Sequence, residues 1–141
     1  MKIIINNLLE DELYSELING YENDHYSGFI YSKDNNDYLC SSSGKGYINI
    51  WDLYNKKIYK TINTNGFYLA HIIEWNKKYI IVADYNNKSF KIIDIDNNSI
   101  YNINPEHKYE LASVKKINHP KYGESLLSAA NDKIIKLWTI E

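Results

Sequence analysis

The chain has 141 residues, of which 44% are hydrophobic and 14% aromatic, a composition that fits one globular domain and excludes a disordered segment. Its formal net charge is −2 and every basic residue is a lysine, so we expect neither a nucleic-acid-binding surface nor arginine clamps for phosphate. The single cysteine, Cys40, excludes an intrachain disulfide and is typical of a reducing compartment.

The start of the chain has three consecutive apolar residues before the sequence becomes polar, which is too few for a signal peptide. No other run approaches the length that spans a membrane, so no membrane partner is expected. We therefore predict a cytoplasmic protein, with the nucleus as the alternative location.

Residues 1–25 give conflicting signals. Three leucines recur at helical spacing, namely Leu9, Leu13 and Leu17. They favour a short helix over about residues 8–18, preceded by a strand at Lys2–Ile5. The alternative is a strand at Glu12–Ile18, because the repeat described below would place one there, and tertiary context can override local propensity.

From Tyr26 onward, short strands alternate with clusters of Asn, Asp and Gly, a pattern typical of an all-β array. The first unit, residues 26–64, is expected to contain strands at 28–32, 37–42, 47–52 and 57–62. The second unit, residues 65–108, is expected to contain strands at 68–74, 79–83, 89–94 and 99–103. The third unit, residues 109–141, is expected to contain strands at 112–117, 125–129 and 134–140, without a fourth strand.

Three segments of the chain are similar to one another, namely Ser41–Trp51, Ala83–Ile93 and Ser128–Trp138. Their last positions are separated by 42 and 45 residues. A recurrence at this period indicates a repeat architecture in which each unit is one small sheet. In the third strand of the first unit, Ile48 and Ile50 lie on one face, and Trp51 and Leu53 lie on the other. Both faces of that strand are therefore apolar.

Leu126–Trp138 resembles the second and third strands of a WD40 repeat, and Trp51 with Asp52 supplies the Trp-Asp pair. The resemblance spans residues 26–141, and its weakest unit is the second, where Ile93 stands in place of Trp. It implies an all-β fold: a partial β-propeller of about three blades, each a four-stranded antiparallel sheet, with the last blade lacking its fourth strand.

In WD40 repeats, a His before the first strand, a Ser on the second, an Asp in the next turn and the Trp form a hydrogen-bonded set. The resemblance assigns Ser128, Asp132 and Trp138 to this set in the third unit, with His107 only a loose match. In the first unit it assigns His25, Ser41 and Trp51, and Lys45 replaces the Asp. The second unit has none of the four.

Three blades are fewer than the smallest usual propeller, which has about four. We therefore expect a fragment or truncated relative of a larger propeller, whose last blade could be completed by Lys2–Ile5 or Glu12–Ile18. A homodimer that forms a six-bladed ring is the alternative.

No residues stand at spacings that indicate catalysis, a cofactor or a metal. The four histidines are far apart and fit no metal-ligand spacing; they are His25, His71, His107 and His119. Asp94 and Asp96 are better explained as turn residues than as a general acid pair. Ser41–Gly46 precedes a strand and lacks the spacing of a phosphate loop, and no nucleophile elbow is present.

The resemblance implies a non-catalytic scaffold that binds other proteins through loops at one end of the blades. The contact positions expected from it are Tyr26, Lys45, Tyr68, Asn86 and Asn87, which lie in turns or at the entry of first strands. The alternatives are a subunit of a propeller enzyme and a decayed fragment without a function of its own.

Overall fold

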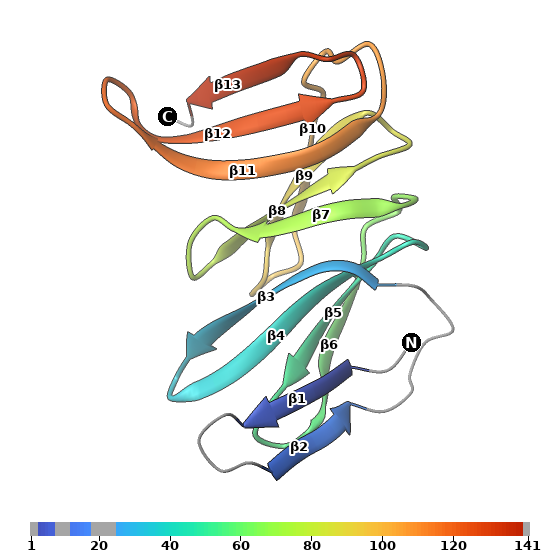
Figure 1. The fold of residues 1–141 in the computed structure, drawn as a ribbon, viewed down its shortest axis with the longest axis vertical. Coiled ribbons are helices and arrows are strands. Elements are labelled where there is room, and N and C mark those ends of the chain that lie inside the picture. Colours follow the sequence, from blue (N-terminus) through green and yellow to red (C-terminus); the bar gives the residue numbers. More distant parts are fainter. Residues whose placement is uncertain (1–2, 8–11, 18–24, 140–141) are drawn as a thin grey trace.

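The computed structural model describes residues 3–7, 12–17 and 25–139, with side chains from Ser27 to Thr139. In this part of the chain there are thirteen strands and no helix, which confirms the predicted all-β class. The strands form antiparallel sheets that are stacked along the molecule in chain order (Figure 1).

Two sheets have four strands and one has three. The first sheet contains β3 (His25–Lys33), β4 (Asn36–Ser43), β5 (Tyr47–Asp52) and β6 (Lys57–Asn63). The second contains β7 (Leu69–Glu74), β8 (Tyr79–Asp84), β9 (Ser89–Asp94) and β10 (Ile100–Ile103). The third contains β11 (Leu111–His119), β12 (Gly123–Ala130) and β13 (Ile135–Thr139). Each is a meander of neighbouring strands, as expected of propeller blades.

The helix predicted over residues 8–18 is wrong where the structure describes it. Glu12–Leu17 forms strand β2, which pairs antiparallel with β1 (Ile3–Asn7), while residues 8–11 and 18 lie outside the described residues. Pairing with β1 overrides the helical spacing of the leucines, since local propensity is a weak constraint. The hairpin is a separate two-stranded sheet, so neither strand completes the third sheet.

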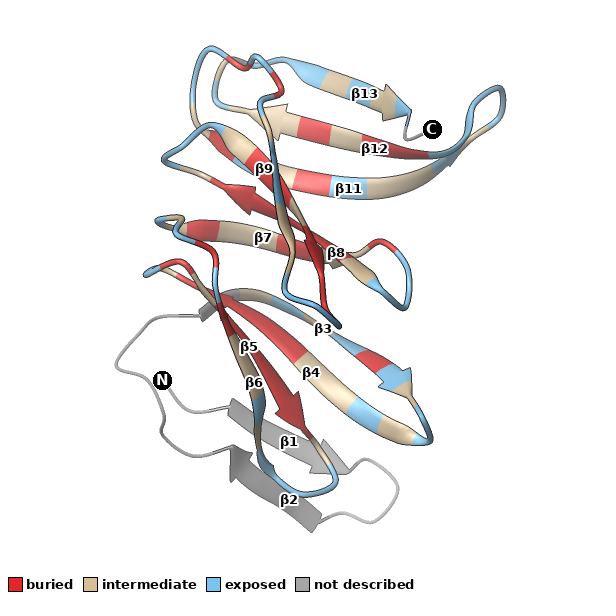
Figure 2. Ribbon diagram, turned by 180° about the vertical axis from the view of Figure 1, so that it is seen from behind, coloured by how far each residue is buried: buried red, intermediate tan, exposed pale blue. Residues whose placement is uncertain are grey.

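The first and second sheets share one apolar core. Its buried residues come from the facing sides of both sheets: Tyr31, Cys40, Ile48, Ile50, Ile62, Leu69, Ile72, Ile80, Val82, Ile93 and Ile95. β8 and β9 are largely buried (Figure 2), because both of their faces are covered by neighbouring sheets. The repeat thus buries the apolar residues of each sheet against its neighbours.

The second and third sheets share another core, on the opposite face of the second sheet. It contains Trp75, Ile81, Ala83, Phe90, Leu111, Val114 and Leu126. Trp138 packs against it, with its ring in an edge-on contact with Phe90 at a centroid distance of 5.8 Å. The Trp that marks the repeat therefore faces the preceding sheet.

The strand pairing corrects the alignment of the second unit by one residue. Trp51 is opposite Leu39, whereas Ile93 is opposite Ile80, so Val82 occupies the place of Ser41 in the first sheet. The step from Val82 to Ile93 in the second unit is therefore one residue longer than the step from Ser41 to Trp51 in the first. Ala83, which aligns with Ser41 when the repeated segments are compared, lies on the opposite face of the second sheet from Val82.

A β-bulge lies near the start of each first strand, and in the first two sheets the residue after it accepts a hydrogen bond from the next sheet. The bulges precede Ser27 in β3, His71 in β7 and Ser113 in β11. The Ser27 hydroxyl oxygen accepts a hydrogen bond from the Ile72 N–H at 3.2 Å, and His71 Nδ1 accepts one from the Val114 N–H at 3.4 Å. The same bond thus recurs at both junctions between sheets.

The turn between β4 and β5 depends on a glycine. Gly46 has a φ of +80°, and its carbonyl oxygen accepts hydrogen bonds from the Thr64 N–H and the Thr64 hydroxyl. A Cβ atom at Gly46 would lie 2.1 Å from the carbonyl oxygen of Gly66. The turn therefore requires both the left-handed backbone and the missing side chain.

We predict that Gly46→Ala lowers the free energy of unfolding by at least about 3 kcal/mol, because backbone strain and a backbone clash add together. Gly123→Ala is the matched control: its φ is +70°, but a Cβ atom there would meet nothing within 4 Å. The control substitution should lower the free energy of unfolding by only about 1–2 kcal/mol. Urea denaturation measures both variants, and equal costs would contradict the close approach at Gly46.

Candidate functional site

A chain of hydrogen bonds joins four polar side chains in the third sheet. The Asp132 carboxylate lies 2.9 Å from His107 Nδ1, and His107 Nε2 lies 2.9 Å from the Ser128 hydroxyl oxygen. The Trp138 indole N–H donates to the same hydroxyl oxygen at 2.8 Å. The geometry brings His107, which the sequence matched only loosely, together with the three residues assigned to the set.

The network also holds two loops in place. Asp132 accepts hydrogen bonds from the backbone N–H groups of Lys108 and Ile134, at 2.9 and 3.0 Å. Burial raises the pKa of the Asp132 carboxyl, but hydrogen bonds from His107, Ile134 and Lys108 outweigh it and hold this pKa below its usual value. Asp132 therefore ties the connection that precedes β11 to the turn between β12 and β13.

The order Asp132, His107, Ser128 resembles a hydrolytic triad in its hydrogen bonding. A nucleophilic serine must reach a substrate carbonyl, whereas Ser128 is 0% exposed. Its oxygen also accepts a hydrogen bond from the indole N–H of Trp138. This arrangement is typical of a structural role for the four residues.

The first sheet contains part of the same set. The Trp51 indole N–H donates to the Ser41 hydroxyl oxygen at 3.1 Å. The side chain of His25 lies outside the described residues, and Lys45 at the position of the Asp is exposed. Asp52 has a different role: its carboxylate accepts hydrogen bonds from the N–H and the side-chain amide of Asn55, which lower the pKa of Asp52 and close the turn after β5.

The second sheet replaces the set with a buried ion pair. Lys91 Nζ lies 3.2 Å from the Asp84 carboxylate, and the two side chains are 6% and 0% exposed. Lys91 also donates to the side-chain oxygen of Asn102, and Asn87 donates to Asp84. The charges are therefore paired and hydrogen-bonded within the junction between the first and second sheets.

Turns and connections gather at one end of the sheets, in an area that we call the loop face. It consists of residues 44–46, 64–68, 85–88, 104–110 and 131–134. Backbone hydrogen bonds join its segments: the Tyr68 N–H donates to the Gly44 carbonyl, the Tyr85 N–H to the Tyr68 carbonyl, and the Asn131 N–H to the Glu110 carbonyl, each at 3.0 Å. These bonds join the loops into two groups, and the Lys88 ammonium links the groups by donating to the Lys108 carbonyl at 3.1 Å.

The contact positions expected from the sequence differ in their environments. Lys45, Asn86 and Asn87 are exposed on the loop face, although the Asn87 amide is hydrogen-bonded to Asp84. Tyr68 is half-buried, with its ring 5.1 Å from that of Tyr85. The side chain of Tyr26 lies outside the described residues.

The sequence analysis missed two exposed aromatic residues on the loop face. Phe67 is 60% exposed and Tyr109 is 48% exposed. Each precedes by two positions the leucine that begins a first strand, Leu69 or Leu111. A comparison of the two connections at this spacing would have identified them as a recurring pair.

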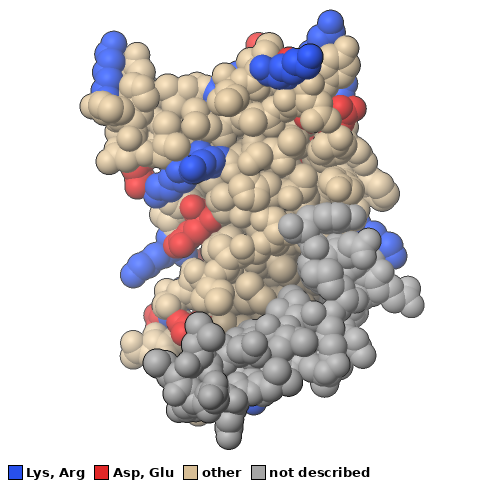
Figure 3. All heavy atoms as spheres, in the orientation of Figure 1, with Lys and Arg blue, Asp and Glu red and all other residues tan. Residues whose placement is uncertain are grey.

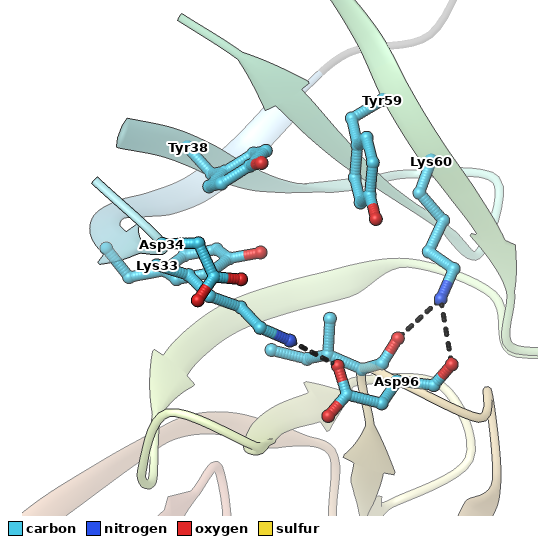
Figure 4. A pocket seen from close by; sticks show the side chains of 8 residues that line it. Lys33, Asp34, Tyr38, Tyr59, Lys60 and Asp96 are labelled. Carbon is cyan, nitrogen blue, oxygen red and sulfur yellow. Dashed lines mark hydrogen bonds and ion pairs between the residues drawn. The ribbon is translucent and has the colours of Figure 1, made fainter. Parts of the chain in front are cut away.

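A cavity of about 130 Å³ lies between the first and second sheets, at the end opposite the loop face (Figure 4). The Lys33 ammonium group is paired with Asp96 at 2.6 Å, and Lys60 donates to the backbone carbonyls of Ile95 and Asp96. Burial raises the pKa of the Tyr31 phenol in its lining. Both lysines of the cavity therefore link the two sheets.

The next junction has a wider cavity, of about 360 Å³, at the corresponding place. Trp75 and Tyr79 occupy the positions of Tyr31 and Tyr38 in its lining. All of its lining residues, which also include Asn76, Ile92 and Tyr101, belong to the second unit.

Within residues 3–7, 12–17 and 25–139, no three His, Cys, Asp or Glu side chains come together in a way that could hold a metal ion. Among the same residues there is no helix with the length and apolar character needed to cross a bilayer. The thiol of Cys40 is buried, and its pKa is raised by burial, which makes it a packing residue.

No family model matches this chain, and no curated protein has detectable similarity to it. The observations that bear on its family are therefore its own repeat, the three antiparallel sheets and the hydrogen bonds within them.

We predict that Asp132→Asn lowers stability at pH 7, and that the difference from the wild-type protein shrinks as the pH falls below about 4, the ordinary value for Asp. The pKa of Asp132 is lowered in the folded chain, so its contribution is complete above the unfolded value and is lost as the carboxyl becomes protonated. Thermal melts at pH 7 and pH 3 test this. A difference that grows toward pH 3 would contradict it.

We also predict that Lys91→Met lowers the free energy of unfolding by about 3–5 kcal/mol, because it removes the cationic partner of the buried Asp84 carboxylate. The double variant Lys91→Met with Asp84→Asn removes both charges and should recover more than half of this loss. A double-mutant cycle in urea measures the coupling between the two residues. Additive costs would show that the pair is not coupled.

Proposed function

We propose that the protein is a non-catalytic module of the WD40 type that binds another protein through its loop face. The observation that carries the proposal is the pair Phe67 and Tyr109, which expose aromatic rings at the same place in two successive units. Exposed aromatic side chains on a rigid scaffold are the residues that most often dominate binding energy.

The WD40 assignment is supported by two kinds of evidence. The repeat in the sequence coincides with antiparallel sheets that have four, four and three strands. In the third sheet, the residues that the resemblance assigns are hydrogen-bonded together with His107. In such a module, the polar set serves to position the loops that contact the partner.

The loop face is suited to binding because its segments are held in place before any partner arrives. Asp132 fixes the connection next to Tyr109, and the bond between Tyr68 and Gly44 fixes the connection next to Phe67. Preorganised loops lose little conformational entropy on binding. The aromatic rings would then supply most of the buried area.

The charge distribution supports a protein partner in preference to nucleic acid. The net charge is −2, and lysines are interspersed with acidic side chains on the face shown in Figure 3. Nucleic-acid binding depends on a continuous basic surface that neutralises phosphates. A mixed surface instead suits the polar rim of a protein interface.

The test is affinity capture from an extract of the source cells with the tagged chain as bait. We expect the double variant Phe67→Ser with Tyr109→Ser to retain at least about tenfold less of the captured protein, because each ring is a candidate for a dominant contact. Both side chains are exposed, so the variant should melt at nearly the wild-type temperature.

The matched control replaces two exposed tyrosines in turns at the opposite end of the sheets. Tyr54 is 81% exposed and Tyr122 is 50% exposed. Tyr54→Ser with Tyr122→Ser should leave capture unchanged. Equal losses in both double variants, or capture that neither affects, would refute binding through the loop face.

A further inference from the structure

The turn between the second and third strands of each of the three sheets presents an exposed lysine on the loop face. All three turns are closed by the same backbone hydrogen bond, which the N–H of Gly46, Lys88 or Lys133 donates to the carbonyl oxygen three positions earlier. These three residues also share a positive φ. In the first turn the lysine is Lys45, one position before the glycine. The repeat thus places an ammonium group at the same corner of each sheet.

At the junction between the first and second sheets, this lysine lies beside an exposed ring. The Tyr68 N–H donates to the Gly44 carbonyl oxygen at 3.0 Å, which holds the turn of Lys45 against the connection that carries Phe67. Phe67 is 60% exposed. The turn and the connection therefore present a cation and an aromatic ring together.

The junction between the second and third sheets repeats this pair. The Lys88 ammonium group donates to the Lys108 carbonyl oxygen at 3.1 Å, directly before the exposed ring of Tyr109. Lys108 adds a second cation, since its Nζ atom lies 5.8 Å from the centroid of that ring. A lysine and an exposed ring thus recur together at both junctions.

The lysines of the loop face form no ion pair with a carboxylate of the described residues; they are Lys45, Lys88, Lys108 and Lys133. Elsewhere in the same part of the chain, four lysines do form such pairs, namely Lys33, Lys78, Lys91 and Lys116. An exposed ammonium group without a carboxylate partner can accept one from another molecule.

The acidic residues of the loop face only partly balance these charges. The loop face has four lysines and three acidic residues, whereas the whole chain has sixteen and eighteen. The side chain of Asp132 is 4% exposed and is already bound by His107. Glu110 is half-buried, and Glu106 is exposed. The outward charge of the loop face is therefore positive, although the chain as a whole is acidic.

We propose that the partner of the loop face presents an extended acidic segment, in which Asp or Glu residues recur next to apolar ones, and that this segment runs across consecutive sheets. The inference rests on the proposed function and specifies the chemistry of the protein that binds there. The apolar side chains of the segment lie against Phe67 and Tyr109, and its carboxylates pair with the neighbouring ammonium groups.

The spacing of the sheets determines the period of the segment. Stacked sheets lie about 10 Å apart, and an extended chain advances about 3.3 Å per residue. Equivalent contacts on neighbouring sheets are therefore about three residues apart in the partner. A segment with one acidic and one apolar residue in every three fits both junctions in succession.

Fluorescence anisotropy of labelled peptides tests the proposal. The probe is a peptide of Glu-Phe-Ser repeats, about twelve residues long so that it spans the three sheets when extended. The matched probe has Gln in place of Glu. We expect the Glu peptide to bind at least about tenfold more tightly, and its affinity to fall as salt is added, because salt screens exposed charges.

Charge reversal on the protein gives the complementary test. Lys45→Glu with Lys88→Glu should weaken binding of the Glu peptide at least about tenfold, because it replaces two attractions with repulsions. The matched control is Lys57→Glu with Lys121→Glu, which changes the net charge equally at the opposite end of the sheets and should bind within about twofold of the wild-type protein. All the substituted lysines are exposed, so both variants should melt near the wild-type temperature.

Absence of binding by the Glu peptide, equal affinities for the two peptides, or equal losses in the two charge variants would overturn the proposal. Tighter binding of a single-stranded DNA of similar length would overturn it too, in favour of bases stacked on the rings. Affinity capture separates this inference from the proposed function. A protein lost by the Phe67 and Tyr109 variant but retained by the Lys45 and Lys88 variant would overturn the acidic segment alone.

Discussion

The burial of both faces of each small sheet is the constraint on which the rest of this structure depends. A lone sheet of four short strands with isoleucines on both sides would expose its apolar residues to water on at least one face. The second sheet resolves this by lying between two others, and its β8 and β9 are almost completely buried. Stability therefore depends on neighbours, as in other repeat architectures, and the third sheet retains exposed apolar side chains at Ile135 and Leu137.

The polar arrangements of the three sheets differ although their apolar packing is alike. The third sheet has the four-residue network around Ser128, the first has at least the bond between Trp51 and Ser41, and the second has the ion pair between Lys91 and Asp84. An arrangement that varies among equivalent sheets cannot be what defines their fold. The polar groups instead fix local features, above all the turns and connections of the loop face.

Much of the fold was predictable because the determining signals are local or periodic. Alternation of apolar residues and clusters of Asn, Asp and Gly place the strands of all three sheets. The pairing of the two N-terminal strands was not predicted, although a strand was expected at Lys2–Ile5 and was the alternative at Glu12–Ile18. Leucines at helical spacing favoured a helix locally, whereas the pairing of Ile3 with Leu17 depends on how the chain folds back. The position of His107, 21 residues before Ser128, likewise depends on how the connection folds back over the sheet.

The bulges were also hidden from sequence analysis, yet they determine what lies at each junction. A bulge changes which side chains share a face, so Ser27, His71 and Ser113 become equivalent only once the strand pairing is known. The same pairing reveals that the alignment of the second unit is shifted by one residue in β8. A one-residue shift moves every side chain to the other face of a strand.

Rigidity and exposure are distributed unevenly over the molecule, and the distribution follows from the way the sheets are joined. At the loop face, backbone hydrogen bonds link each turn to a neighbouring connection, so exposed rings such as Phe67 and Tyr109 stand on a fixed base. At the opposite end, the sheets are linked by long lysine side chains, as in the contact of Lys33 with Asp96. Such exposed ion pairs contribute little and tolerate change. Because binding favours preorganised surfaces, this difference between the two ends is the reason why we propose the loop face as the binding surface.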